Sequence, residues 1–245
     1  MTSDSASPNA VNSPTVGERA PELVAGVRAW TTTRDAGTFG LGGSDAVGDV
    51  VGRWGKLQDE LEATGIVRIA SAHQTHDAVV ARHEGEWRGW LRMRGVDGHF
   101  TTRPGTALAV TVADCTPVFI AHPAGAIAAI HAGWRGTAGG ILEIGLAMFV
   151  AQGFGVADLV VHLGPAICGE CYEVGPEVIS AIHGRPAISK GQLDVRAVLA
   201  ARAEARGVRS VSVSASCTRH DNSRFFSHRA GDSGRQLGII ALDAG

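Results

Sequence analysis

Residues 108–140 read "LAVTVADCTPVFIAHPAGAIAAIHAGWRGTAGG" and consist of two apolar runs joined by a short turn. The turn is Pro123–Gly125, where proline presets the first position and glycine takes the left-handed one. We therefore predict a β-hairpin in which His122 faces Ala126. Because the runs show almost no polar alternation, we expect both strands to be covered on both faces.

The register of this hairpin decides where a thiol and an imidazole lie. His131 would face Pro117, which is two residues after Cys115, so Cys115 and His131 would share one face of the sheet. As diagonal neighbours they would lie about 7–8 Å apart. One metal ion with bonds of about 2.0–2.3 Å can bridge such a gap. A loop one residue longer would turn one of the two side chains to the opposite face.

A zinc ion needs a third protein ligand, and the segment "AHQTHDA" at 72–78 offers His73 or His76. Spacing alone leaves both histidines open. Three ligands with an open fourth position is the arrangement of catalytic zinc, and such an ion lowers the pKa of bound water toward neutrality. The alternative is that Cys115 is a small buried apolar side chain and His131 a hydrogen-bonded core residue.

The rest of the chain predicts an α/β layered sandwich with a mixed sheet, because paired strands dominate its centre. Residues 1–20 are rich in Ser, Pro, Asn and Ala and are predicted to be a disordered tail, followed by a single catalytic domain at 21–245. We predict strands at 65–76, 77–85, 106–115, 116–122, 125–133, 158–164, 209–216 and 236–242, and helices at 44–64 (capped by Ser44), 137–152 (capped by Thr137), 176–183 and 194–206.

Composition is that of a soluble globular protein: 245 residues, 44% apolar, 19% charged, with a formal net charge of −2. No single-sign charge field indicates a nucleic-acid or membrane partner. No apolar run reaches the roughly 18–20 residues of a membrane helix. The N-terminus lacks the apolar segment of a signal peptide, so we expect a cytoplasmic protein. There, four cysteines favour metal-binding or reactive roles over disulfides.

Five segments, in this order, resemble the YfiH/laccase-domain family: "HQTH", "ADCTPVFI", "IHAGWRGT", "GPAICGECYEVGPEV" and "CTRHDNSRFFSHRAGDSGRQ". Members are described as polyphenol oxidases, as peptidoglycan editing factors and as purine nucleoside phosphorylases. The resemblance implies a four-layer α/β/β/α sandwich with mixed sheets, similar to a cytotoxic necrotizing factor toxin domain. It also implies zinc ligands at His76, Cys115 and His131.

The resemblance further implies an activity, namely zinc-dependent phosphorolysis of adenosine, inosine, guanosine and methylthioadenosine, with hydrolytic deamination of adenosine. Deamination needs an acidic group that moves a proton, and Asp114 is the candidate nearest to Cys115. Phosphorolysis needs a bound phosphate, and the planar guanidinium of arginine suits that dianion. The arginines in family motifs are Arg34, Arg135, Arg229 and Arg235, of which we expect Arg34 and Arg135 to bind phosphate most directly.

A second cysteine motif is the pair Cys168-Gly-Glu-Cys171. It can be read as a redox pair or as half of a four-cysteine zinc site, for which Cys115 and Cys217 are the remaining thiols. No typical redox context surrounds it, so we expect loop cysteines near the candidate site.

Other function classes remain open. A copper-dependent polyphenol oxidase of the laccase type needs many histidines, and the ten here include no His-x-His pair. A Cys–His hydrolase acting on peptidoglycan precursors would use Cys115 as nucleophile and His131 as base. A non-enzymatic partner protein would need neither residue. On the favoured interpretation the partners are purine nucleosides and phosphate, and the chain is a monomer or weak homo-oligomer.

Overall fold

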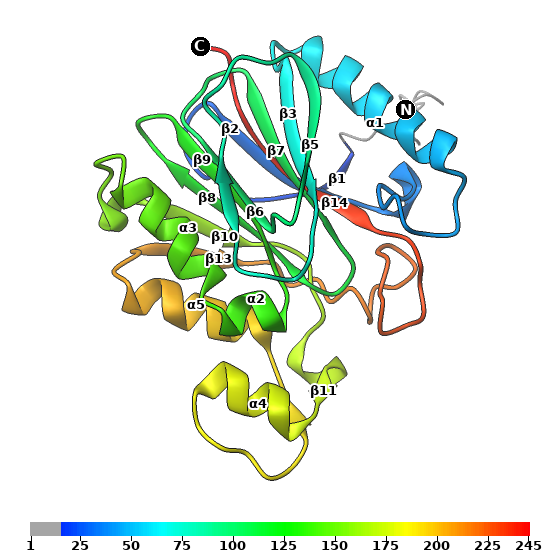
Figure 1. Ribbon diagram of the computed structural model, residues 1–245, viewed down its shortest axis with the longest axis vertical. Coiled ribbons are helices and arrows are strands. Elements are labelled where there is room, and N and C mark those ends of the chain that lie inside the picture. Colours follow the sequence, from blue (N-terminus) through cyan, green and yellow to red (C-terminus); the bar gives the residue numbers. More distant parts are fainter. Residues whose placement is uncertain (1–15) are drawn as a thin grey trace, which may run out of the picture.

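The computed structural model describes residues 16–245, which form two mixed six-stranded sheets between layers of helices (Figure 1). The first sheet has the order β1-β2-β14-β7-β3-β5 and the second β13-β10-β8-β9-β6-β4. The strands of the first are Gly17–Arg19 (β1), Val27–Thr32 (β2), Gln236–Leu242 (β14), Thr106–Val112 (β7), Arg68–His73 (β3) and Gly89–Arg94 (β5). Those of the second are Ser210–Val213 (β13), Val160–Leu163 (β10), Thr116–His122 (β8), Ala126–Ala132 (β9), Gly98–Thr101 (β6) and Val80–Arg82 (β4).

Three apolar clusters hold four layers together. Helix α1 (Val47–Glu62) packs on the first sheet through residues such as Trp54 and Leu57. The two sheets pack on each other through residues such as Leu108 of β7 and Phe119 of β8. Helices α3 (Ile141–Val150) and α5 (Val195–Ala205) cover the second sheet. The implied four-layer α/β/β/α sandwich is therefore confirmed.

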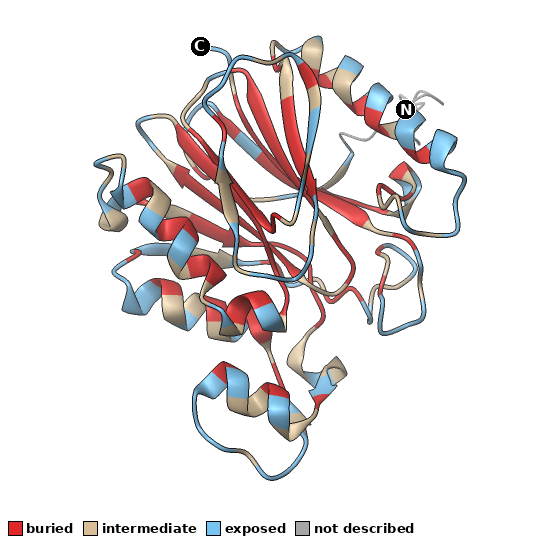
Figure 2. Ribbon diagram, viewed as in Figure 1, coloured by how far each residue is buried: buried red, intermediate tan, exposed pale blue. Residues whose placement is uncertain are grey.

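Burial follows this layering, since the central strands are buried while the helices expose their outer faces (Figure 2). Along β9 even-numbered residues such as Ala128 and Ile130 face the helices, and odd-numbered ones such as Ile127 face the first sheet. Both faces of the strand are thus covered, as its continuous apolar run predicts. Within residues 16–245 no helix is both long enough and apolar enough to span a membrane.

The hairpin prediction is confirmed. His122 pairs with Ala126 and Pro117 with His131 across β8 and β9. The loop is Pro123–Gly125, closed by the N–H of Gly125 donating to the carbonyl of His122 over 3.0 Å, with Gly125 at φ +85°.

Two predicted helix starts are wrong. The predicted 137–152 helix is two helices, α2 (Trp134–Ala138) and α3, because Gly139 and Gly140 interrupt it and Gly140 is left-handed. Thr137 therefore lies inside α2 rather than capping a helix. Ser44 does not cap α1 either, since its hydroxyl bonds to the hydroxyl of Ser233 over 2.8 Å.

The remaining elements are short. They are α4 (Pro176–His183), the small sheet of β11 (Glu173–Val174) and β12 (Gly191–Gln192), and 3-10 turns η2 (Arg34–Ala36), η3 (Val156–Asp158) and η4 (Gly169–Cys171). The sequence analysis missed β2, β5 and β6. The predicted disordered tail at 1–20 lies mostly outside the described residues, but its end is wrong because Gly17–Arg19 pairs with β2. A single catalytic domain over 21–245 stays a prediction.

Candidate active site

The carboxyl ends of β3, β7 and β9 open onto one cavity with a volume of about 670 Å³. This volume is within the range of about 300–1,000 Å³ typical of sites for small organic ligands. Loops from distant parts of the sequence complete its wall, among them the glycine-rich segment 40–43 and the segment carrying His228 and Arg229.

His76, Cys115 and His131 meet on the wall of this cavity. Their ligand atoms all lie within 4.8 Å of one another, and the two imidazole rings are edge to face with centroids 4.7 Å apart. Cys115 directly precedes β8 and His131 lies near the end of β9, as the hairpin register requires. His73 also lines the cavity but is not part of this cluster, so the geometry separates the two histidines that spacing left open.

The loop that carries His76 is held by one buried carboxylate, Asp97. Its Oδ2 accepts from the backbone N–H groups of Thr75 and Asp77 over 3.0 and 3.1 Å, and its Oδ1 accepts from that of His76 over 2.9 Å. His76 has φ +61°, a left-handed conformation that costs about 1–2 kcal/mol for a residue with a side chain. The three hydrogen bonds stabilise that conformation.

Asp97 also orients the second imidazole. Its Oδ1 lies 2.8 Å from Nδ1 of His131, and its carbonyl accepts from the backbone N–H of His131 over 2.7 Å. Burial alone would raise the pKa of Asp97, but the hydrogen bonds from His131, Thr75 and Asp77 lower it to about 2. A carboxylate bonded to Nδ1 leaves Nε2 of His131 as the nitrogen available to a ligand.

Cys115 and His131 change each other's protonation. Burial opposes ionisation of the thiol, yet His131 and His76 together lower the pKa of Cys115 to about 6. Burial likewise opposes the imidazolium, yet Cys115 and Asp97 raise the pKa of His131 to about 9. Both shifts favour a thiolate beside an imidazolium over a neutral thiol beside a neutral imidazole.

The candidate phosphate ligands do not all reach the cavity. Arg135, Arg229 and Arg235 line it, and so does Arg92, which the sequence analysis did not single out. Arg34 lies elsewhere: it pairs with Asp232 and donates from Nε to backbone carbonyls. The geometry therefore does not support the prediction that Arg34 binds phosphate, because its guanidinium is bound to Asp232 and to backbone carbonyls.

The three cavity arginines that were predicted to bind phosphate differ in their contacts. The guanidinium of Arg135 lies 4.3 Å from the ring centroid of Trp134 and makes no ion pair with a described residue. That of Arg229 stacks on Tyr172 at 4.9 Å and donates to a backbone carbonyl over 3.0 Å. Arg235 binds the carbonyls of its own loop, the shortest contact being 2.7 Å to Gly234. Of these three guanidinium groups, that of Arg135 is therefore the least engaged by described residues.

Asp114 is the sole carboxylate among the described residues that line the cavity. Its backbone has φ +79°. Oδ1 accepts from the hydroxyl of Thr218 over 2.7 Å and Oδ2 from the backbone N–H of Arg229 over 2.6 Å. These contacts hold the carboxylate beside Cys115 at the cavity wall.

Sequence reasoning missed two residues that position the site. Asp97 is fully buried, and its signal was a lone acid inside "GVDGHF" at 95–100, a segment with no other acidic or basic residue except His99. Gln74 fixes the start of its loop, because its side-chain amide both donates to and accepts from the backbone of Thr111 over 2.8 Å.

Comparison with known proteins identifies the family. A family model described as "Multi-copper polyphenol oxidoreductase laccase" matches residues 29–243. Purine nucleoside phosphorylase ORF3 of Streptomyces griseus is 34% identical over 220 residues, covering 84% of this chain and 88% of that protein. Adenosine deaminase RL5, from an unknown prokaryotic organism, is 33% identical over 191 residues, covering 70% of this chain and 71% of that protein.

A solved structure shows the same fold. The crystal structure of YlmD from Geobacillus stearothermophilus matches with a TM-score of 0.83 at 30% sequence identity, covering 91% of this chain and 94% of that one. The family match spans most of the chain, and the fold agrees over the same range. The chain therefore belongs to the laccase-like YfiH family.

Proposed function

We propose that this protein is a zinc-dependent purine nucleoside phosphorylase that also deaminates adenosine. The observation that carries the proposal is one cavity that joins the cluster of His76, Cys115 and His131 to several arginines and a single carboxylate. The names of two relatives, a purine nucleoside phosphorylase and an adenosine deaminase, support the same pair of reactions.

The donor set fits zinc. One thiolate and two imidazoles are borderline-soft ligands of the kind that hold catalytic zinc with a position left open. Among residues 16–245, the groups that could hold a metal are this cluster and one of three cysteines and a histidine, and neither supplies the extra imidazoles of a multicopper centre. Bound zinc would supply a Lewis acid that activates water at neutral pH.

The other residues of the cavity would bind phosphate and transfer the proton. Arg135, supported by Arg229 and Arg235, would bind phosphate beside the glycosidic bond. Four lining arginines, counting Arg92, against one carboxylate give the cavity the charge that a phosphate dianion needs. Asp114 would move the proton between the attacking water and the leaving amino group during deamination.

The test is an activity assay on the purified, zinc-loaded protein. With adenosine and phosphate we expect release of adenine and ribose 1-phosphate, and with adenosine alone we expect inosine. Inosine, guanosine and methylthioadenosine should each release their base when phosphate is present. Formation of neither free base nor inosine would contradict the proposal.

Zinc affinity should rise with pH. Between about pH 6 and about pH 9 the metal-free site carries one proton on His131 that a metal must displace. We therefore expect the affinity to increase about tenfold per pH unit in this window and to level off above it. Chelator competition at several pH values measures this, and a flat affinity would contradict the assignment of His131 as a ligand.

Gly133→Ala should weaken zinc binding. A Cβ at Gly133 would lie 3.0 Å from Sγ of Cys115 and 3.3 Å from a ring carbon of His76, so both side chains must move. We expect zinc affinity to fall about tenfold or more, measured by chelator competition. Gly52→Ala, on the open face of α1, is the control and should leave the affinity unchanged.

Arg135→Gln should raise KM for phosphate by about 10–100-fold, because a charge-assisted hydrogen bond is worth about 1.5–3 kcal/mol. Deamination of adenosine, which uses no phosphate, should change little. Steady-state kinetics of both reactions on one preparation tests this. Arg88→Gln, whose side chain is 69% exposed and pairs with Glu62, is the control; an equal loss in both reactions would count against a phosphate role for Arg135.

One observation favours a second candidate function. The thiolate of Cys115 beside the imidazolium of His131 is also the pair of a Cys–His hydrolase, here one acting on peptidoglycan precursors. Metal binding and thiolate attack compete for the same sulfur. Chelation should abolish the zinc enzyme but leave a hydrolase active, so a chelator separates the two.

The location, domain extent and oligomeric state of the enzyme stay predictions. We propose a cytoplasmic enzyme whose single catalytic domain spans residues 21–245, acting as a monomer or weak homo-oligomer on nucleosides rather than on nucleic acid. The near-neutral charge balance supports the last point.

A further inference from the structure

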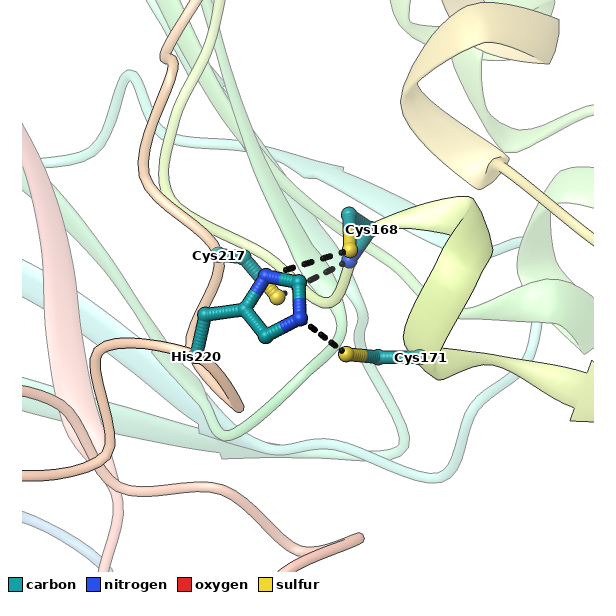
Figure 3. A group of neighbouring side chains, drawn as sticks. All are labelled: Cys168, Cys171, Cys217 and His220. Carbon is teal, nitrogen blue, oxygen red and sulfur yellow. Dashed lines mark hydrogen bonds between the residues drawn. The ribbon is translucent and has the colours of Figure 1, made fainter.

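A second cluster of metal-binding side chains lies outside the candidate active site. Cys168, Cys171, Cys217 and His220 each offer a ligand atom, and these atoms lie within 4.8 Å of one another. Figure 3 shows the three cysteine side chains gathered around the imidazole of His220, with the four residues coming from two segments of the chain. All four cysteines of the chain are free thiols.

The two loops are built alike. Each supplies two donors separated by two residues, as Cys168-Gly-Glu-Cys171 and as Cys217-Thr-Arg-His220. Two such pairs, brought together by the fold, are the ligand pattern of structural zinc sites with three cysteines and one histidine. His220 was not predicted as a partner of the first pair, for which only cysteines were expected.

Backbone contacts bring the two pairs together. Ala166 and Cys217 form an isolated parallel bridge. The N–H of Cys171 donates to the carbonyl of Cys168 over 3.1 Å, closing the turn of the first pair. In the second pair, the N–H of Asp221 donates to the carbonyl of Cys217 over 2.8 Å. Backbone bridging and hydrogen bonding therefore hold the two pairs close together.

The side chains are placed for a shared cation. Nε2 of His220 lies 3.1 Å from Sγ of Cys171, and Nδ1 of the same ring lies 3.8 Å from Sγ of Cys168. Tetrahedral zinc with bonds of about 2.1 Å to nitrogen and about 2.3 Å to sulfur holds a nitrogen and a sulfur ligand about 3.6 Å apart, between these two separations. The N–H of Cys168 also points at Sγ of Cys217 over 3.3 Å. Backbone donors of this kind stabilise a thiolate.

We propose that Cys168, Cys171, Cys217 and His220 bind a second zinc ion, closed on all four sides and structural. Four protein ligands leave no open position, whereas the cluster of His76, Cys115 and His131 keeps one. The two ions therefore have different roles, and the second does not depend on the proposed enzymatic function.

The second ion would stabilise the wall of the cavity. Ile167, one residue before Cys168, lines the cavity and donates its N–H to the carbonyl of Asp114 over 3.1 Å. Thr218, one residue after Cys217, donates its hydroxyl to Asp114 over 2.7 Å. A zinc that joins the two loops thus fixes both sides of the segment leading to Cys115.

The test is the zinc content of the full-length protein, purified with a reductant and measured by elemental analysis and native mass spectrometry. We expect two zinc ions per chain in the wild type and one in both Cys171→Ser and His220→Ala. Cys115→Ser should also hold one, and Cys115→Ser combined with His220→Ala none. His183→Ala, an exposed histidine on α4, is the matched control and should keep two.

The conservative variant His220→Cys keeps four ligands and should still bind two ions, which separates loss of a ligand from failure to fold. One zinc per wild-type chain that is lost in Cys115→Ser but retained in Cys171→Ser would overturn the proposal and leave the first site intact. A disulfide among Cys168, Cys171 and Cys217, seen as a mass loss in the reductant-purified protein, would overturn it as well.

Discussion

Cys115→Ser is expected to abolish phosphorolysis and deamination together, with a loss in kcat/KM of at least about 10³-fold for each reaction. The cysteine is the thiolate of the three-residue cluster, and a serine hydroxyl does not ionise to replace it at neutral pH. The variant should also lose one zinc per chain. Steady-state kinetics and elemental analysis on the same sample measure both effects.

Two further variants test which histidine is the zinc ligand. His76→Ala should behave as Cys115→Ser does, because it removes another member of the cluster. His73→Ala should retain the zinc, since His73 lines the cavity outside the cluster. Retention of wild-type activity by Cys115→Ser, or loss of zinc in His73→Ala but not in His76→Ala, would contradict the assignment of the ligands.

Asp97→Asn is expected to have the largest effect on stability. The fully buried carboxylate accepts from three backbone N–H groups and from His131, and an amide nitrogen would face donors where an oxygen is needed. Breaking a buried charge pair of this kind costs about 3–5 kcal/mol of the free energy of unfolding. Zinc affinity should fall about 10–100-fold because His131 loses its orienting partner.

Denaturant unfolding of the zinc-free protein and chelator competition at neutral pH measure the two effects separately. Asp59→Asn, an exposed acid on α1, is the control and should alter neither. Asp97 has a folded-state pKa of about 2 against an ordinary 3.8, so its contribution is present above about pH 4 and is lost as the pH falls toward about 2. Wild-type stability and affinity in Asp97→Asn would contradict its role as the residue that positions the site.

The sequence predicts the hairpin at the centre of the fold because its turn chemistry is strong. Proline and glycine at Pro123–Gly125 fix the loop length, and the loop length fixes the register that puts Cys115 and His131 on one face. Periodicity does not reveal the break at Gly139–Gly140 or the strands β2, β5 and β6, since short mixed segments become strands through pairing with distant partners.

The candidate site likewise contains residues that the sequence predicts and residues that it does not. His76 was distinguished from His73 by family resemblance, and the fold gives the physical reason, namely a left-handed turn fixed by Asp97. Asp97 is distant in sequence from both residues that it orients, so the lone acid of the segment 95–100 marks a buried carboxylate but does not identify its partners. Arg34 illustrates a different limit, because the sequence motif that contains it does not reveal that its guanidinium pairs with Asp232 of the same chain.

The central claim is that His76, Cys115 and His131 hold one zinc ion at the wall of a nucleoside-sized cavity. Anomalous diffraction at the zinc absorption edge, on crystals of the zinc-loaded protein, tests it most directly. We expect an anomalous peak within bonding distance of Sγ of Cys115, Nε2 of His131 and a ring nitrogen of His76. A zinc-loaded crystal without a peak there, or with these three side chains turned away from one another, would contradict it.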